Sequence, residues 1–218
     1  MTDTMIDKDL IEPFWLRVRH ALDALRPAPR ADGPGGDLPA MARAIGKRPK
    51  PGLRIEQEMA NGWTRAAGQH VSLSLLVIEI DAMQDYLATY GKPAADDCAA
   101  SVMQAVTDML PRDSDVCLRW GAATFVLVLP DLPVLMARAS ATKMHDAVRR
   151  LGLEHKESHA GTVTVSMGLA VSNPRGNYDR KLFRAALEAL KKAQRKGLAR
   201  IETIDLRPAQ ESKRKKAA

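Results

Sequence analysis

The segment LRWGAATFVLVLPD, residues 118–131, combines two short apolar runs with a turn between them. The runs cover residues 116–120 and 124–129, and Gly121-Ala122 stands between them. Short apolar runs on either side of a glycine-containing turn are typical of a β-hairpin. The segment therefore predicts two adjacent antiparallel strands.

The sequence on either side of this hairpin alternates between two hydrophobic periods. Strand-like runs occupy residues 72–80, 162–171 and 199–204, and helical periodicity occupies residues 53–67, 94–110, 133–151 and 178–196. Helices that alternate with strands around one hairpin favour a mixed sheet covered by helices. We therefore expect a single α/β (α+β) domain over residues 53–206.

Two flanking regions differ in composition from this domain. Residues 1–25 carry an amphipathic helical stripe, and residues 26–52 contain six of the thirteen prolines. We expect an extra N-terminal helix on a Pro/Gly-rich basic linker, and a basic, disordered tail at 207–218. Because the helix cannot bury its own stripe, we expect it to dock on the domain or on a protein partner.

The net charge of +7 is unevenly distributed along the chain. The linker and the tail contribute +4 each, the N-terminal region −2, and residues 53–206 only +1. A nucleic-acid interface is marked by a basic face, with aromatic side chains where single strands are bound, and only 4% of residues are aromatic. This count predicts no nucleic-acid partner.

The sequence predicts a cytoplasmic protein. The longest apolar run, residues 73–80, is too short to cross a bilayer, so no transmembrane segment is expected. The N-terminus lacks the apolar stretch of a secretory signal. Cys98 and Cys117 stand far apart and form no metal-binding pattern, which predicts free thiols and no metal site.

Five segments in this order resemble the GGDEF family, whose members condense two GTP molecules into cyclic di-GMP. These segments are LSLLVIEID (73–81), TYGKPAADD (89–97), LRWGAATFVLVLPD (118–131), VTVSMGLAV (163–171) and LEALKKAQRKGLARI (187–201). The resemblance covers residues 53–204. It implies a nucleotide-cyclase-like mixed sheet and a role in bacterial signal transduction.

The same resemblance implies a degenerate signature. The family sequence Gly-Gly-(Asp/Glu)-Glu-Phe is replaced by Gly121, Ala122, Ala123, Thr124 and Phe125. Ala123 offers no oxygen to a metal ion, and Thr124 lacks the charge of a carboxylate. Ala122 places a Cβ where the family's glycine lets the nucleotide approach the backbone.

Substrate contacts are also missing when the family pattern is carried over. The family's phosphate-binding and guanine-binding residues correspond to Gln84, Leu87, Gln194 and Leu198. Each charge-assisted contact of this kind contributes roughly 1.5–3 kcal/mol, so we expect a pseudoenzyme. The acidic residues that remain form a vestigial active site: Glu79, Asp81 and Asp96. An active cyclase that uses these acids differently is the distant alternative.

One ligand motif of the family is preserved. Arg112 and Asp115 form an Arg-x-x-Asp motif five residues before Gly121, which is the spacing of the family's inhibitory product site. A guanidinium can bind a phosphate or a guanine edge through two hydrogen bonds, and a carboxylate can accept hydrogen bonds from guanine. The family's supporting arginine corresponds to Lys143, which lacks the planar fork. Residues 111–115 would equally suit a plain turn.

Two non-enzymatic functions therefore stand open. In the first, the domain is a cyclic di-GMP receptor that uses Arg112, Asp115 and Lys143, with cyclic di-GMP as a regulatory ligand and no cofactor. In the second, the fold is a nucleotide-independent protein-interaction or oligomerisation module. It would then contact an unidentified protein partner through the N-terminal helix, or form a homodimer.

Overall fold

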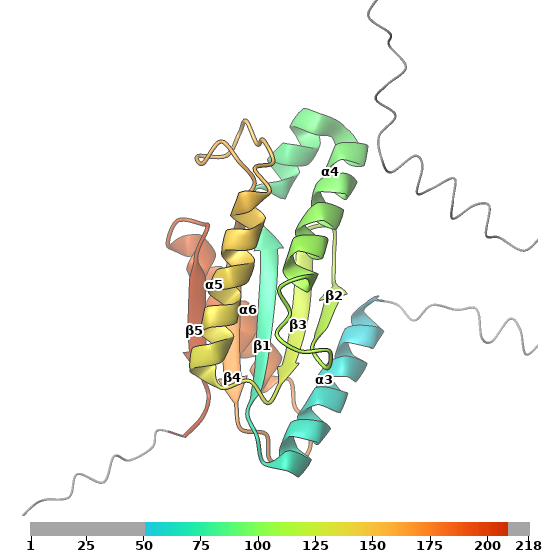
Figure 1. Cartoon of the computed structure of the whole chain (residues 1–218), viewed down its shortest axis with the longest axis vertical. Coiled ribbons are helices and arrows are strands. Elements are labelled where there is room, and N and C mark those ends of the chain that lie inside the picture. The colour runs from blue at the N-terminus through green and yellow to red at the C-terminus, as the bar shows by residue number, and fades with distance from the viewer. Residues whose placement is uncertain (1–50, 209–218) are drawn as a thin grey trace, which may run out of the picture. The chain divides into compact units, whose positions relative to one another are not determined.

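The computed structural model describes residues 51–208. The predicted N-terminal helix, the linker up to residue 50 and the tail from residue 209 lie outside the described residues. A five-stranded sheet with helices on both faces confirms the expected α/β fold (Figure 1). The helices are α3 (Pro51–Gln69), α4 (Met83–Thr107), α5 (Val134–Arg150) and α6 (Lys181–Arg195). The strands are β1 (Leu73–Ile80), β2 (Val116–Arg119), β3 (Thr124–Pro130), β4 (Val165–Ser172) and β5 (Ile201–Asp205).

The strands are arranged in the order β2-β3-β1-β4-β5. Strand β1 lies at the centre and pairs antiparallel with both β3 and β4, while β4 and β5 are parallel. Strands β2 and β3 form the predicted hairpin, with Arg119 opposite Phe125. The register places Glu79 of β1 between Thr124 of β3 and Ser166 of β4. The C-terminal end of β1 therefore meets the hairpin turn.

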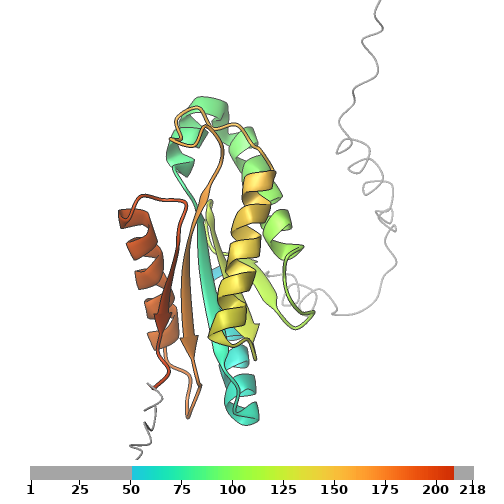
Figure 2. The same cartoon turned by 60° about the vertical axis from the view of Figure 1, so that its left-hand side comes forward.

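Side chains that alternate along the strands divide the core into two layers. One layer contains Leu76 and Ile78 of β1 and packs under α4 and α5. The other contains Leu75 and Val77 and packs under α3 and α6. Turning the molecule shows α6 on the opposite side of the sheet from α5 (Figure 2). This two-sided covering explains why β1, β3 and β4 are almost fully buried along their length.

Helix α6 approaches the sheet most closely at Gly168 of β4. A Cβ added at Gly168 would overlap the carbonyl oxygen of Ala186 and the backbone of Leu190. The helix backbone thus rests directly on the strand, and glycine is required by this close approach. The contact fixes the height of α6 above the sheet.

Helix α4 differs from the sequence expectation. It was expected from residue 94, but it begins at Met83 and is kinked at Gly91, which has φ 81° and ψ 170°. Pro93 lies two residues beyond the kink, where a second helical segment starts and its missing N–H costs nothing. The first segment positions residues 83–90 beside the end of β1. Helix α3 also begins earlier than expected, because Pro51 and Gly52 belong to it.

The two cysteines are free thiols, as expected. Burial raises the pKa of Cys98 and of Cys117 to about 11 in each case, so both remain protonated near neutral pH. Within residues 51–208, no helix is both long and apolar enough to span a bilayer.

Candidate functional site

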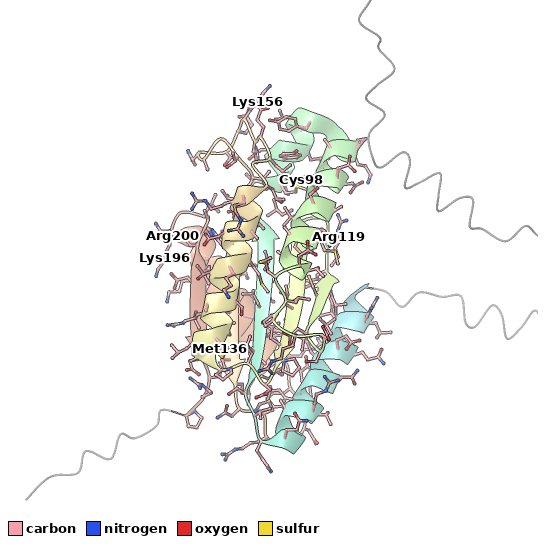
Figure 3. The ribbon with its side chains drawn as sticks, in the orientation of Figure 1. Cys98, Arg119, Met136, Lys156, Lys196 and Arg200 are labelled. Carbon is pink, nitrogen blue, oxygen red and sulfur yellow. The ribbon has the colours of Figure 1, made fainter. Side chains whose placement is uncertain are left out.

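The turn between β2 and β3 is held in place by Arg119. Its Nε donates to the carbonyl of Gly121 at 2.9 Å, and its Nη2 donates to the carbonyl of Ala122 at 2.8 Å. The backbone N–H of Trp120 closes the turn by donating to Thr124 O at 2.8 Å. Figure 3 shows Arg119 at the upper end of this hairpin. The guanidinium of Arg119 therefore stabilises the turn through these two hydrogen bonds.

The remaining signature residues serve the fold. Phe125 is fully buried in the core layer under α4 and α5, and Ala123 packs against the same layer. The carbonyl of Ala123 accepts a hydrogen bond from the backbone N–H of Ile80 at 3.0 Å, which joins the turn to the end of β1. These contacts bring the signature and the end of β1 together.

Glu79 makes a hydrogen bond that the sequence does not reveal. Its Oε1 accepts from Nε2 of Gln194 on α6 at 3.0 Å. Its strand neighbour on one side is Thr124, whose hydroxyl brings no charge. Among the described residues, no group of three or more His, Cys, Asp or Glu side chains is placed to hold a metal ion. The carboxylate is thus engaged by an amide from the last helix.

Asp81 is buried, and both of its carboxylate oxygens are engaged in hydrogen bonds. Oδ1 accepts from Ser166 Oγ at 2.6 Å, and Oδ2 accepts from Thr164 Oγ1 at 2.8 Å and from Ala199 N at 3.0 Å. Ala199 and the adjacent Leu198 both have positive φ, a conformation that costs energy for residues other than glycine. Asp81 therefore joins the end of β1, the start of β4 and the strained segment after α6.

Asp96 lies on the second segment of α4, on the side of the hairpin turn. It is 3.7 Å from Arg119 and 3.4 Å from Lys92, and its side chain is half exposed. Leu87, which the resemblance places where the family has a guanine-binding asparagine, is 45% exposed. Of the three predicted acids, Asp81 is used internally, Glu79 is bonded to Gln194, and Asp96 stands at the surface.

A pocket of about 410 Å³ opens beside Asp81. It lies between the start of α4, the loop around residues 157–160 and the segment 197–199. Its lining includes the carboxylates of Asp85 and Glu157 and no lysine or arginine. A triphosphate in this pocket would meet negative charge without a cation to neutralise it.

The Arg-x-x-Asp motif forms a turn between α4 and β2, at the other end of the central strands. The backbone N–H of Asp115 donates to Arg112 O at 3.1 Å. The guanidinium of Arg112 points to the end of β3, where Nη1 lies 3.1 Å from Asp131 Oδ2 and 3.3 Å from Pro130 O. Both members of this ion pair are partly exposed. Asp131 was not identified from the sequence, because the pair depends on how the hairpin folds back onto the turn.

Asp115 presents a carboxylate that is buried without a partner. Its side chain is 7% exposed, and neither oxygen has a hydrogen-bond partner among the described residues. Burial raises the pKa of Asp115, and the backbone amide and positive charge of nearby Arg112 partly offset this effect. A buried carboxylate of this kind is a strong acceptor for any donor that reaches it.

Lys143 is not brought into contact with this turn. It is exposed on α5, and it makes no ion pair within residues 51–208. It stands nine residues into a helix that begins near Asp131, which places it about 14 Å along the helix axis. The nearby His145 is mostly buried, and its Nδ1 lies 3.6 Å from Asp146. The structure therefore groups Arg112 and Asp115 and leaves Lys143 apart.

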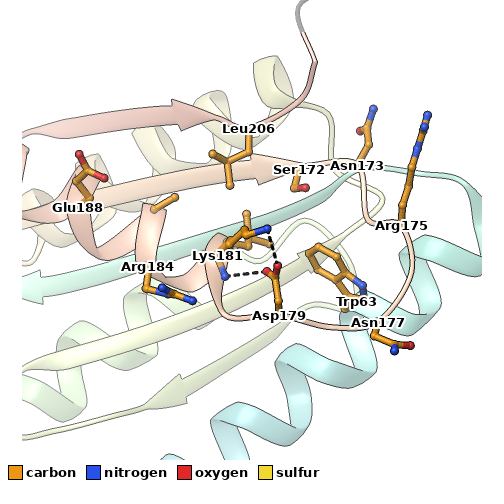
Figure 4. Close-up of a pocket in the computed structure, with 12 residues that line it drawn as sticks. Trp63, Ser172, Asn173, Arg175, Asn177, Asp179, Lys181, Arg184, Glu188 and Leu206 are labelled. Carbon is orange, nitrogen blue, oxygen red and sulfur yellow. Dashed lines mark hydrogen bonds and ion pairs between the residues drawn. The ribbon is translucent and has the colours of Figure 1, made fainter.

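A second pocket, of about 540 Å³, lies at the start of α6 (Figure 4). Trp63 forms part of its wall and donates through Nε1 to Gly176 O at 3.0 Å. Asp179 accepts from the backbone N–H of Lys181 and pairs with its Nζ at 3.2 Å, which satisfies the first turn of the helix. None of the residues predicted from the sequence lines this pocket.

Comparison with protein families matches residues 53–200 to the family described as diguanylate cyclase, GGDEF domain. Among curated proteins, diguanylate cyclase DosC of Escherichia coli K12 is 30% identical over 130 residues, which are 60% of this chain and 28% of that protein. Probable diguanylate cyclase DgcC of the same strain is 26% identical over 147 residues, which are 67% and 39% of the two chains. The chain thus spans well under half the length of these relatives.

Solved structures show the same architecture. The GGDEF domain of DgcB from Caulobacter crescentus, in complex with c-di-GMP, matches with a TM-score of 0.62 at 20% identity, over 68% of this chain and 87% of that chain. Diguanylate cyclase SiaD from Pseudomonas aeruginosa, solved with its activator SiaC, matches with a TM-score of 0.63 at 21% identity, over 87% and 68%. At these identities the likeness establishes the fold.

Proposed function

The chain belongs to the GGDEF family, and from that membership we propose that it is a catalytically inactive, cytoplasmic signalling protein that binds cyclic di-GMP through Arg112 and Asp115. The observation that carries the binding proposal is the buried carboxylate of Asp115, which has no partner among the described residues. The proposed loss of catalysis is supported by the hydrogen bond between Glu79 and Gln194 and by the absence of carboxylates in residues 121–125.

Inactivity follows from what a cyclase must do at this end of the sheet. Its metal ions need several hard, anionic oxygens in octahedral geometry. Glu79 is the strand neighbour of Thr124, and Gln194 of α6 donates a hydrogen bond to its carboxylate. Ala123 and Thr124 add no carboxylate. A bound metal–triphosphate complex would therefore lack both its anionic ligands and the cations that neutralise pyrophosphate.

Guanine complements the unpartnered carboxylate. The N1 and N2 hydrogens of guanine form a parallel pair of donors, and a carboxylate accepts such a pair through both oxygens. Arg112, three residues earlier in the same turn, supplies a planar fork for a phosphate or for the O6 and N7 edge of a base. A dinucleotide of two guanosines and two phosphates offers both groups together.

Binding requires Arg112 to exchange partners. In the structure its guanidinium pairs with Asp131 at 3.1 Å. Because both side chains are partly exposed, this pair stabilises the free state by only about 0.2–1 kcal/mol. A phosphate or guanine edge that accepts two hydrogen bonds can replace it.

Titration calorimetry with purified protein and cyclic di-GMP tests the proposal. We expect micromolar or tighter binding that is lost in Arg112→Ala and retained in Asp113→Asn, a matched change within the same turn but outside the motif. No heat in the wild-type protein would refute the receptor. GTP with Mg²⁺ in a parallel titration and a product assay should show no turnover.

A nucleotide-independent interaction module remains the second candidate. It is favoured by the exposure of Leu135 and Met136 at the start of α5, which are 75% and 57% exposed. These two side chains would contribute apolar area to a contact surface. If calorimetry shows no nucleotide binding, capture of a partner by the wild-type protein and its loss in Leu135→Ser/Met136→Ser would establish this function.

A further inference from the structure

Positive charge in the domain is concentrated on α6. Residues 180–200 contain eight lysines and arginines and one acidic residue. The other residues between 53 and 206 contain eleven basic and seventeen acidic residues. The near-neutral total of the domain therefore combines a basic segment, residues 180–200, with an excess of acidic residues elsewhere.

Three of these cations form a line along the outer surface of the helix. Arg184, Lys191 and Arg195 are separated by seven and four residues, so they share one face of the helix and span about 17 Å. All three are exposed, and none makes an ion pair within residues 51–208. Their face is opposite the alanines and leucines that pack on the sheet. We call these three residues the α6 basic line.

Further basic side chains flank the line. Lys192 and Lys196 share Glu202 at 3.3 and 2.7 Å, which holds both amines on one flank of α6. Lys196 and Arg200 lie together at the outer edge of the molecule (Figure 3). Measured around the helix, the cations from Arg180 to Lys196 cover about 160° of its circumference. Within this arc, Arg180 pairs with Glu56 at 3.0 Å and Lys181 with Asp179 at 3.2 Å.

We propose that the outer face of α6 binds the phosphate backbone of duplex nucleic acid without sequence preference. A stripe of lysine and arginine along one helix is the electrostatic footprint of such binding. The major groove of a duplex is wide enough for an α-helix, and its walls carry phosphates on both sides. Cations spread over a wide arc of one helix can reach both walls at once.

A duplex fits this face better than a lipid surface does. None of the exposed large apolar residues among the described residues lies on α6, so the face has nothing to insert into a bilayer. A flat membrane would also reach only the crest of the helix. The excess of acidic residues elsewhere in the domain repels any polyanion and leaves α6 as the face that can approach.

This inference goes beyond the proposed receptor function and does not depend on it. Arg112 and Asp115 lie on the turn before β2, and α6 covers a different part of the sheet. The loss of cyclic di-GMP binding would leave the α6 basic line unchanged. A variant without the α6 basic line would likewise keep Arg112 and Asp115.

Fluorescence anisotropy with a labelled 20-base-pair duplex tests the inference on the full chain. The test variant is Arg184→Gln/Lys191→Gln/Arg195→Gln. The control is Arg65→Gln/Arg149→Gln/Arg150→Gln, which removes the same charge from exposed positions on α3 and α5. Each phosphate contact contributes about 0.9 to the slope of log affinity against log salt, so the test variant should flatten the slope by about 2.7. The control should flatten it far less.

Glu188 provides a change in the opposite direction. It is the one acid on the outer face of α6, within the row of the basic line. Glu188→Gln should tighten duplex binding about two- to five-fold, since it removes a like charge from the contact. Glu58→Gln on α3, which makes the same change in net charge, should have little effect.

Two outcomes would overturn the inference. One is a slope that is unchanged in the test variant, or reduced equally in the test and control triple variants, because the phosphate contacts would then lie outside the α6 basic line. The other is binding to vesicles of phosphatidylglycerol and phosphatidylcholine with no binding to the duplex. Equal affinities for duplexes of unrelated sequence support the lack of sequence preference, and a strong preference for one sequence contradicts it.

Discussion

At the scale of single residues, the acids left at the end of β1 are used for structure. Asp81 accepts three hydrogen bonds, from Thr164, Ser166 and Ala199. Asparagine has nearly the same shape, but its amide nitrogen cannot accept. The cost of losing the carboxylate is therefore the cost of leaving buried donors without an acceptor.

We expect Asp81→Asn to lower the free energy of unfolding by about 2–4 kcal/mol. Urea unfolding followed by circular dichroism measures this change. Asp85→Asn, an exposed carboxylate four residues along, should change stability by less than about 0.5 kcal/mol. Equal effects in the two variants would show that the hydrogen bonds of Asp81 contribute little.

Asp131 competes with the ligand for Arg112 in the proposed receptor. Asp131→Asn should tighten cyclic di-GMP binding about two- to five-fold, since the free state loses an exposed ion pair. Calorimetry measures the affinity, with Asp113→Asn as the control. Weaker binding in Asp131→Asn would mean that Asp131 helps to hold the ligand.

Asp115 should make stability depend on pH. Its pKa in the folded protein is raised above the ordinary value of 3.8, so the folded state holds a proton that the unfolded state has released. Asp115 therefore destabilises the fold progressively as pH rises from 3.8 through the raised pKa of the folded state. Relative to wild type, Asp115→Asn should gain stability in urea unfolding as pH rises above 3.8. Parallel pH profiles for the two proteins would contradict a raised pKa.

At the scale of secondary-structure elements, the position of α6 depends on one close contact. The helix backbone at Ala186 and Leu190 leaves no room for a Cβ at Gly168. Gln194 and the α6 basic line belong to the same rigid helix. A shift of α6 would therefore move both.

We expect Gly168→Ala to destabilise the domain by about 3 kcal/mol, because the overlap is with backbone that cannot rotate away. The melting temperature should fall clearly in a thermal scan. Gly68→Ala is the matched control, since it lies in α3 with no atom near the new methyl group and should raise stability by up to about 1 kcal/mol. A neutral Gly168→Ala variant would mean that α6 can move away from the sheet.

Helix α4 shows where sequence periodicity fails. Helical periodicity predicts this helix only from residue 94, and Tyr90-Gly91-Lys92-Pro93 is typical of a turn. The structure keeps a helix on both sides, because Gly91 adopts a positive φ and Pro93 lies where a helix tolerates it. Gly91 and Pro93 correctly indicate an interruption of the helix, but the sequence around them does not show whether the helix continues on the other side.

At the scale of the whole molecule, the fold could be predicted and part of the site could not. Strand and helix periods depend on local sequence, and their alternation around the hairpin at 118–131 was enough to predict a mixed sheet covered by helices. The bond between Glu79 and Gln194 joins residues 115 positions apart, and the Arg112–Asp131 pair depends on how the hairpin folds back. The charge summed over the whole domain did not show the α6 basic line, because the fold decides which face of α6 packs on the sheet and which is exposed.

If the protein is inactive as we propose, catalysis would need changes in several elements at once. Restoring the signature with Ala122→Gly/Ala123→Asp/Thr124→Glu should give no cyclic di-GMP from GTP and Mg²⁺. Gln194 would still bond Glu79, and the phosphate and guanine positions at 84, 87 and 198 would still be unsuited. Chromatography of the reaction mixture detects the product, and an intact spectrum confirms folding. Product formation by this variant would refute the inactive assignment of the remaining site.

The concentration of cations on α6 and the excess of acids elsewhere also give the domain an electric dipole moment. A molecule whose opposite charges lie on different elements rotates in the field of any charged body that it approaches. In dilute buffer, α6 of one copy should then attract the acidic elements of another, and moderate salt should keep copies apart. An isoelectric point cannot report this orientation, because it depends only on the sum of the charges.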